Sequence, residues 1–187
     1  MVKKMLVCLL LSVFCFSLSS DAQAIKKKPW LVVYSSLTGN TQKIAEAIFQ
    51  VLPAGSEIYS VENAPSPDGY ENVAIGFWTK KGTADDKAAE YLQKVTNANV
   101  FIFATMGSYA DTDYAQTVLT RGEALLGEGC TVLGKFICQG KLSPERLENA
   151  KKRGVTPERE KRWQDASTHP DEQDVVNVQT AIKKLLK

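Results

Sequence analysis

Strongly apolar runs alternate with helical patterns along most of this chain. The runs at 29–36, 71–78 and 99–107 (PWLVVYSS, ENVAIGFW and NVFIFATMG) are dominated by apolar residues. Strands that are buried on both faces and separated by helices form a parallel sheet with helices on both sides. The sequence therefore predicts an α/β fold, a doubly wound sandwich of three layers.

The remaining segments complete a five-stranded pattern. Further strands are expected at 56–64 and 130–140, and helices at 41–52, 85–96, 113–129 and 171–187. A chain of 187 residues, 44% of them hydrophobic, fits one globular domain with a substantial core. Doubly wound sheets bind ligands beyond the carboxyl ends of their strands, where the strand order reverses. The loops after the first, third and fourth strands are therefore the candidate binding loops.

The first 24 residues differ in character from the rest. Lys3 and Lys4 precede an apolar run from 5 to about 18, and Ala22-Gln23-Ala24 follows it. This order is typical of a secretory signal peptide with an Ala-x-Ala cleavage site. The run is shorter than the ~20 residues that span a bilayer, so a permanent membrane anchor is the weaker alternative. We expect cleavage after residue 24 and an exported domain, 25–187, in the periplasm or outside the cell, without stable membrane insertion.

Cys130 and Cys138 are the two cysteines that remain after such cleavage. An oxidising compartment favours a disulfide between two such residues. If the run between them is a strand, however, their Cα atoms lie more than about 20 Å apart, and a disulfide needs less than ~7 Å. We expect both thiols to be free.

One segment, 142–168, does not fit the alternation of strands and helices. Its two parts, SPERLENAKKRG and TPEREKRWQDAS, each open with a hydroxyl residue followed by proline, which predicts two short capped helices. One interpretation is a solvated cover over one sheet edge. The other is a docking surface, because basic side chains outnumber the acidic ones around them. These basic residues are Lys151, Lys152, Arg153, Arg159, Lys161 and Arg162.

The loop after the first strand is rich in hydroxyl groups. Five of its polar side chains are Ser35, Ser36, Thr38, Asn40 and Thr41, and Gly39 among them permits a tight turn. A loop that enters a helix offers unpaired backbone N–H groups and the positive end of the helix dipole, which attract an anion. The nucleotide motifs Gly-Lys-Ser/Thr and Gly-x-Gly-x-x-Gly are absent. The loop therefore suits one terminal phosphate, although simple helix capping is the alternative for one or two of the hydroxyls.

This loop, SSLTGNT followed by QKIAEAI, resembles the phosphate-binding loop of flavodoxins. The resemblance implies a flavodoxin-like sandwich with strand order 2-1-3-4-5 and flavin mononucleotide (FMN) as the cofactor. It also implies roles for particular positions. In the phosphate loop these are Ser35, Ser36, Thr38, Gly39, Asn40 and Thr41; after the third strand Phe77, Trp78, Thr79, Lys80 and Gly82; after the fourth strand Thr105, Met106, Gly107, Ser108, Tyr109 and Asp111.

Within those sets, Trp78 and Tyr109 stand where flavodoxins place aromatic rings on either side of the flavin. Core packing is the alternative for both side chains. Gly107 would let the backbone approach the ring edge, and Gly82 is the candidate for the peptide that reorients on reduction. Lys80 and Lys81 depart from the usually acidic family, and near the ring they would raise the reduction potential, whereas side chains that point into water would have little effect.

The resemblance implies an FMN-binding electron carrier that serves a reductase outside the cytoplasm. An FMN-dependent reductase or dehydrogenase acting on a quinone or tetrapyrrole is the alternative, with 142–168 building a substrate pocket. A non-catalytic accessory protein that has lost the flavin is the third. The sequence gives little support to other chemistry: His169 fits a structural role, no zinc ligands or serine triad stand at useful spacing, and one basic cluster is weak evidence for nucleic acid.

Overall fold

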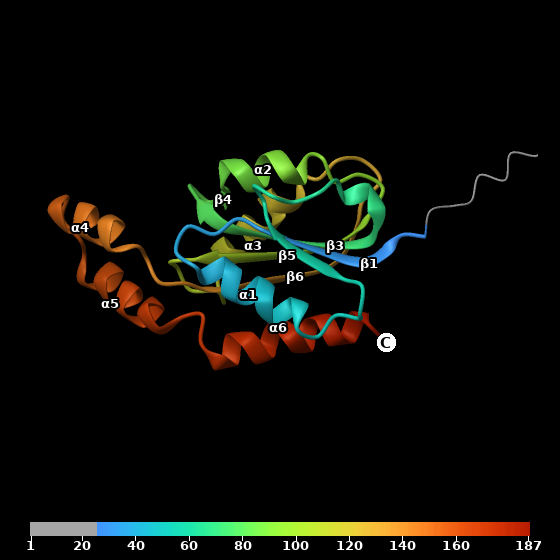
Figure 1. Ribbon diagram of the computed structural model, residues 1–187. Coiled ribbons are helices and arrows are strands. Elements are labelled where there is room, and N and C mark those ends of the chain that lie inside the picture. The colour runs from blue at the N-terminus through green and yellow to red at the C-terminus, as the bar shows by residue number, and fades with distance from the viewer. Residues whose placement is uncertain (1–25) are drawn as a thin grey trace, which may run out of the picture.

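A five-stranded parallel sheet forms the centre of the molecule, with one short antiparallel strand attached (Figure 1). The computed structural model describes residues 26–187. Its strand order, β2-β1-β3-β5-β6, is the predicted order 2-1-3-4-5 with the short β4 counted separately. The strands are β1 (Lys28–Tyr34), β2 (Glu57–Ser60), β3 (Tyr70–Lys80), β4 (Thr83–Ala84), β5 (Asn99–Met106) and β6 (Thr131–Gln139).

Helices cover both faces of the sheet, which confirms the predicted three layers. The helices α1 (Asn40–Phe49) and α6 (Glu172–Leu185) lie on one face, and α2 (Asp86–Leu92) and α3 (Asp113–Glu123) lie on the other (Figure 1). A 3-10 turn, η1 (Pro67–Gly69), leads into β3. Each face has its own apolar core, so the central strands are buried on both sides.

Alternate side chains of the central strands enter the two cores. In β1, Leu31 and Val33 pack under α2 and α3, whereas Trp30 and Val32 pack under α1 and α6. Every residue of β5 after Asn99 is buried. Successive side chains of a strand point to opposite faces, so a strand covered on both sides must be apolar throughout. This requirement explains why the apolar runs show no alternation.

The strand order reverses between β1 and β3, which are parallel neighbours. From β1 the chain crosses to β2 on one side, and from β3 it proceeds to β5 and β6 on the other. The loops that leave the two strands therefore separate and open a crevice at this edge. The predicted phosphate loop and the loop after β3 border this crevice.

A hairpin follows β3 where the sequence analysis expected only a loop. Lys80 pairs with Thr83 of β4, and the two residues between them, Lys81 and Gly82, have φ angles of 52° and 81°. Two positive φ angles define the type I′ turn that suits the twist of a hairpin. Lysine is an unusual residue at such a position, so the turn lacks the usual sequence signal.

The two predicted extra helices are present as α4 (Pro144–Lys152) and α5 (Pro157–Asp165), followed by the 3-10 turn η2 (Ala166–Thr168). The hydroxyls of Ser143 and Thr156 cap them, as predicted. Their expected place over one sheet edge is wrong. Both helices project beyond the carboxyl ends of the strands (Figure 1). Trp163 is the only buried residue of the two helices.

Cys130 and Cys138 are both free, as expected. Cys138 is buried, and burial raises the pKa of its thiol well above the usual value. None of the helices described within 26–187 is long and apolar enough to cross a membrane. The predicted signal peptide lies outside the described residues.

Candidate flavin site and adjoining pocket

The loop between β1 and α1 presents unpaired backbone N–H groups at the start of the helix. Gly39 occupies the N-cap position with a φ angle of 82°, in the left-handed region that glycine adopts without strain. Because Gly39 has no side chain, the N-cap residue accepts no side-chain hydrogen bond from the first turn of α1. The N–H donors that a cap would normally satisfy are therefore available to an anion.

A buried hydroxyl without a partner also lies in this loop. Within the part of the chain that the structure describes, Ser36 Oγ is shielded from solvent and forms no hydrogen bond. Buried polar atoms are nearly always paired, so an orphaned hydroxyl at a helix start suits a bound oxyanion. This loop fits the phosphate group of FMN, with Ser36, Thr38 and the first amides of α1 as the groups that would hold it.

Neighbouring side chains fix the shape of the loop. Asn40 Nδ2 donates to Thr38 Oγ1 at 2.8 Å and to the carbonyl of Lys141 at 2.9 Å. The hydroxyls of Thr41 and Thr105 are 2.9 Å apart, which ties the start of α1 to the end of β5. Asn40 and Thr41 thus help to position the loop as well as being candidate ligands.

Ser35, although predicted as a ligand, bonds inside the protein. Its hydroxyl donates to Asp85 Oδ1 at 2.7 Å, and Asp85 also caps α2 by accepting from the Ala88 amide. Asp85 is 3% exposed, and burial raises the pKa of its carboxyl group. Its second oxygen has no partner among the described residues. Ser35 therefore joins β1 to α2.

The three aromatic residues predicted in the flavin site occupy different environments; of these, Trp78 and Tyr109 were expected to flank the ring. Phe77 lies in the core, where its ring fills the space that a Cβ atom at Gly122 would need. Trp78 is half-buried at the crevice, and the guanidinium of Arg146 lies 5.9 Å from its ring centre. Tyr109 is 36% exposed, and its hydroxyl donates to Asp165 on α5 at 2.8 Å. That hydrogen bond raises the pKa of Tyr109.

A small hollow and a large pocket adjoin at the carboxyl ends of the strands. The small one borders the phosphate loop and includes Trp78. The large one has a volume of about 780 Å³. The two share Thr79, Met106, Gly107, Leu142 and Arg146, so they form one connected space.

The other predicted residues divide between this space and the surface. Gly82, Ser108 and Tyr109 line the large pocket, and Thr105 lines the small hollow. Lys80 forms an ion pair with Asp86, and the neighbouring Lys81 lines the large pocket. Asp111 is exposed and lines neither space. The Gly82 carbonyl accepts a hydrogen bond from Arg121 at 3.2 Å.

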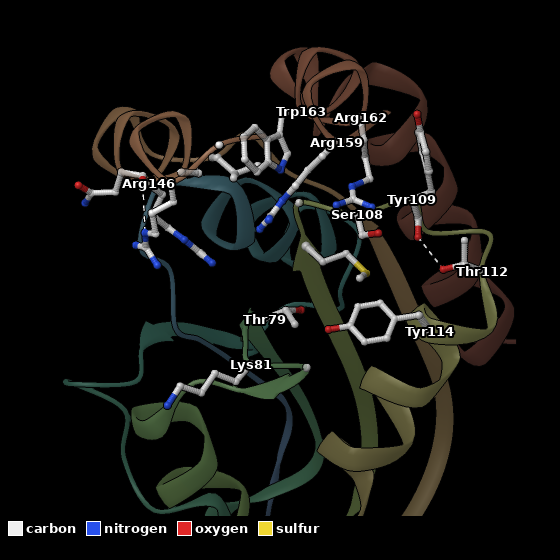
Figure 2. A pocket seen from close by; sticks show the side chains of 18 residues that line it. Thr79, Lys81, Ser108, Tyr109, Thr112, Tyr114, Arg146, Arg159, Arg162 and Trp163 are labelled. Atoms are coloured by element: carbon white, nitrogen blue, oxygen red, sulfur yellow. Dashed lines mark hydrogen bonds between the residues drawn. The ribbon is translucent and has the colours of Figure 1, made fainter. Parts of the chain in front are cut away.

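The outer wall of the large pocket consists of residues from 142–168, the segment that the reductase alternative assigned to a substrate pocket without naming its lining residues. Figure 2 shows arginine side chains reaching from α4 and α5 toward the strand ends, with Tyr114 opposite them. The spacing of these residues is a signal that could have found them, because i, i+3, i+4 and i+7 share one helix face. The lining residues are Arg146, Asn149 and Ala150 on α4, Arg153 directly after it, and Arg159, Arg162 and Trp163 on α5.

His169 lies away from this space, at the start of α6. Its Nδ1 is 2.6 Å from Asp174 Oδ2, and Asp174 and Asp171 form the capping box of the helix. Among the described residues these three are the one group close enough to share a metal ion. Their hydrogen bonds already account for the arrangement, which is consistent with a structural role.

The fold and the phosphate loop together define a flavin-binding redox protein. A flavodoxin domain model matches residues 31–183, and the chain belongs to the flavodoxin family, with FMN as its cofactor. The predicted family and cofactor are thereby confirmed.

Individual relatives support this assignment. The chain is 29% identical over 167 residues to flavodoxin-like domain-containing protein BilS of Clostridioides difficile (strain CD3), a match covering 83% of this chain and 95% of the relative. It is 30% identical over 174 residues to BilS of Clostridium symbiosum (strain WAL-14163), covering 80% and 92%. The crystal structure of oxidised flavodoxin 2 from Bacillus cereus shares the fold, with a TM-score of 0.55, 18% identity, and coverage of 84% of this chain and 99% of that one.

Proposed function

We propose that this protein is an electron carrier that accepts electrons on bound FMN and delivers them to a reductase outside the cytoplasm. The observation that carries the proposal is the phosphate loop, where an uncapped helix start and the orphaned Ser36 hydroxyl suit the cofactor's phosphate. When bound, FMN supplies one- and two-electron redox chemistry.

The protein's own residues would hold and tune the cofactor. The loop binds the phosphate, Trp78 and Gly107 line the neighbouring hollow, and Lys81 contributes positive charge from the turn after β3. A carrier needs the ring edge to be reachable by a partner. The connection between the small hollow and the large, open pocket is compatible with that need.

The proposed location depends on the sequence before residue 25. Lys3 and Lys4, the apolar run and Ala22-Gln23-Ala24 support export by the general route and cleavage after Ala24. N-terminal sequencing of protein collected outside the cytoplasm should begin at Ile25. An intact Met1 in the membrane fraction would replace this proposal with an anchored protein.

A reductase acting on a small molecule, such as a quinone or tetrapyrrole, is the second candidate. The observation that favours it is that α4 and α5 enclose the large pocket, which Gly82, Gly107 and Tyr109 of the predicted flavin-ring site also line. A substrate held under these helices would therefore lie over the flavin ring, as a reductase requires. Arg146, Arg153, Arg159 and Arg162, which we call the arginine wall, line this pocket and would favour an anionic substrate.

Spectroelectrochemistry of the FMN-loaded protein separates the two candidates. A one-electron carrier should show two resolved one-electron steps, and it should reduce a protein acceptor whether or not the pocket is filled. A single two-electron step, with rapid oxidation by small quinones and none by protein acceptors, would favour the reductase. A protein that leaves FMN fluorescence and absorption unchanged would contradict both and support a non-catalytic accessory role.

A further inference from the structure

The large pocket gathers positive charge far beyond the average of the chain. Its lining includes four arginines, Arg146, Arg153, Arg159 and Arg162. Lys81 lies on the opposite side, and Figure 2 shows its side chain directed away from the arginines. The described residues that line it include no aspartate or glutamate. The whole chain has a formal net charge of only +2, so cations are concentrated here. Like charges around one hollow repel each other, and an anion inside it relieves that repulsion.

The arginines of the wall have no carboxylate partners within 26–187. The ion pairs in that part of the chain use lysine side chains or His169. In addition, Arg162 Nε is buried and makes no hydrogen bond there. A buried N–H without an acceptor costs free energy, because it has lost water without a replacement. Arg162 therefore offers a donor that a bound anion would satisfy.

The shape and the apolar lining indicate a small organic molecule. Gly82, Gly107 and Tyr109 of the predicted flavin-ring site line one side of the pocket of about 780 Å³, so the ring takes up part of this volume and a second ligand would occupy the part beneath the arginines. Met106, Leu142 and Trp163 place apolar surface beside the cations. The Arg159 guanidinium lies 4.9 Å from the centre of the Trp163 ring, which orients its donors. A planar guanidinium matches the two oxygens of a carboxylate.

We propose that this pocket binds an organic carboxylate with a planar, apolar body, between the flavin ring and the arginines of α4 and α5. Thr79, Met106 and Gly107 line both this pocket and the hollow that adjoins the phosphate loop, which places such a ligand against the flavin. The proposal rests on the flavin redox function for its purpose, whereas the binding is a property of the pocket residues themselves. It assigns the arginine wall to a small ligand, separate from the phosphate of FMN.

Calorimetric titration of the FMN-loaded protein tests the proposal with two matched probes. The first, 2-naphthoate, carries a carboxylate, and the second, 2-naphthalenemethanol, has the same ring system without charge. We expect the carboxylate to bind at least tenfold more tightly, with an affinity that falls as salt rises. The double variant Arg159→Gln/Arg162→Gln should lose that preference, because each lost charge-assisted hydrogen bond reduces affinity by about tenfold to a hundredfold.

Two further variants separate a specific site from general charge. Lys183→Gln/Lys184→Gln removes two cations at the end of α6, outside the pocket, and should leave naphthoate binding unchanged. Arg159→Lys/Arg162→Lys keeps the charge but removes the planar fork, and it should retain an intermediate affinity. Circular dichroism and the visible spectrum would show that each variant is folded and still holds FMN.

Several results would overturn the proposal. Equal binding of the two probes would mean that the pocket selects for apolar surface alone. No binding of naphthoate to the parent protein, or an equal loss in the α6 control, would remove the site. Release of FMN by naphthoate would show that the wall belongs to the flavin site. Retention of FMN is read separately from the spectrum, so a failed probe leaves the proposed flavin function intact.

Discussion

The phosphate loop and the arginine wall both suit anions, but they do so by different physical means. The loop is uncharged and relies on hydroxyls and backbone amides at the start of α1. The wall relies on full positive charges at the ends of flexible side chains. Amides fixed by a buried strand and helix select one geometry at close range. Exposed guanidinium groups attract anions over a longer range, and salt weakens that attraction.

The two regions also differ in how the fold supports them. The loop follows β1, whose central residues are fully buried, and hydrogen bonds from Asn40 and Thr41 hold it in place. The helices of the wall bury only Trp163. Segments with few buried apolar contacts open more readily than the core of a domain. Single substitutions in α4 and α5 should therefore destabilise these two helices without changing the structure of the phosphate loop.

The largest effect is expected for Trp163→Ala. Replacing a mostly buried tryptophan by alanine typically lowers the free energy of unfolding by about 3–5 kcal/mol. Here it should mainly weaken the packing of α5, because Trp163 is the buried residue of that helix. Hydrogen exchange should become much faster throughout α4 and α5, while the amides of β5 keep their protection. As a control, Lys161→Ala removes only a surface ion pair with Asp165 and should change little. If both variants destabilise β5 equally, the wall is part of the central cooperative unit.

A smaller effect is expected on the reduction potential, where the two lysines after β3 should behave differently. Lys81 lines the large pocket, whereas Lys80 is paired with Asp86. We expect Lys81→Glu to lower the two-electron potential by tens of millivolts, because each unit charge a few ångströms away contributes on the order of 1 kcal/mol. Lys80→Glu should shift the potential less. Spectroelectrochemistry over a range of salt measures both. Equal shifts would show that the pairing of Lys80 does not direct its charge away from the flavin.

The smallest effect concerns Asp85, beneath the phosphate loop. Burial raises the pKa of this carboxyl group above its ordinary value of 3.8, so the folded state binds its proton more tightly than the unfolded state does. Stability should therefore fall as pH rises above 3.8 and through the folded pKa. Asp85→Asn cannot ionise and should lack this part of the pH dependence, as measured by urea unfolding. Asp111→Asn is the exposed control. A parallel pH profile for Asp85→Asn and the parent would contradict the burial argument.

Local sequence signals predicted the parts of the site that depend on short segments. The glycine and hydroxyls of 35–41 define the loop, and the Ser-Pro and Thr-Pro starts of α4 and α5 define two helices. Where those helices lie depends on contacts distant in sequence, which explains the wrong placement over one sheet edge. Their arginine spacing indicates a shared face but does not identify what that face meets.

Two other differences have simple geometric causes. Phe77 and Trp78 are neighbours in β3, and adjacent strand residues point to opposite faces, so both could not face one crevice. Phe77 turned into the core against Gly122. The hairpin after β3 depends on a positive φ angle at Lys81, which its side chain does not favour. Neither feature could be predicted from composition or periodicity.

The central claim is that FMN is held through the loop and that the orphaned Ser36 hydroxyl serves its phosphate. The most direct test compares the affinities of FMN and riboflavin for the parent protein, Ser36→Ala and Arg159→Gln/Arg162→Gln. Because Ser36 Oγ has no partner within the described fold, Ser36→Ala should leave the free energy of unfolding nearly unchanged. It should weaken FMN binding by about 1.5–3 kcal/mol and leave riboflavin binding unaltered, while the arginine variant keeps its FMN affinity. Equal losses for both flavins in Ser36→Ala, or loss of FMN from the arginine variant instead, would contradict the account.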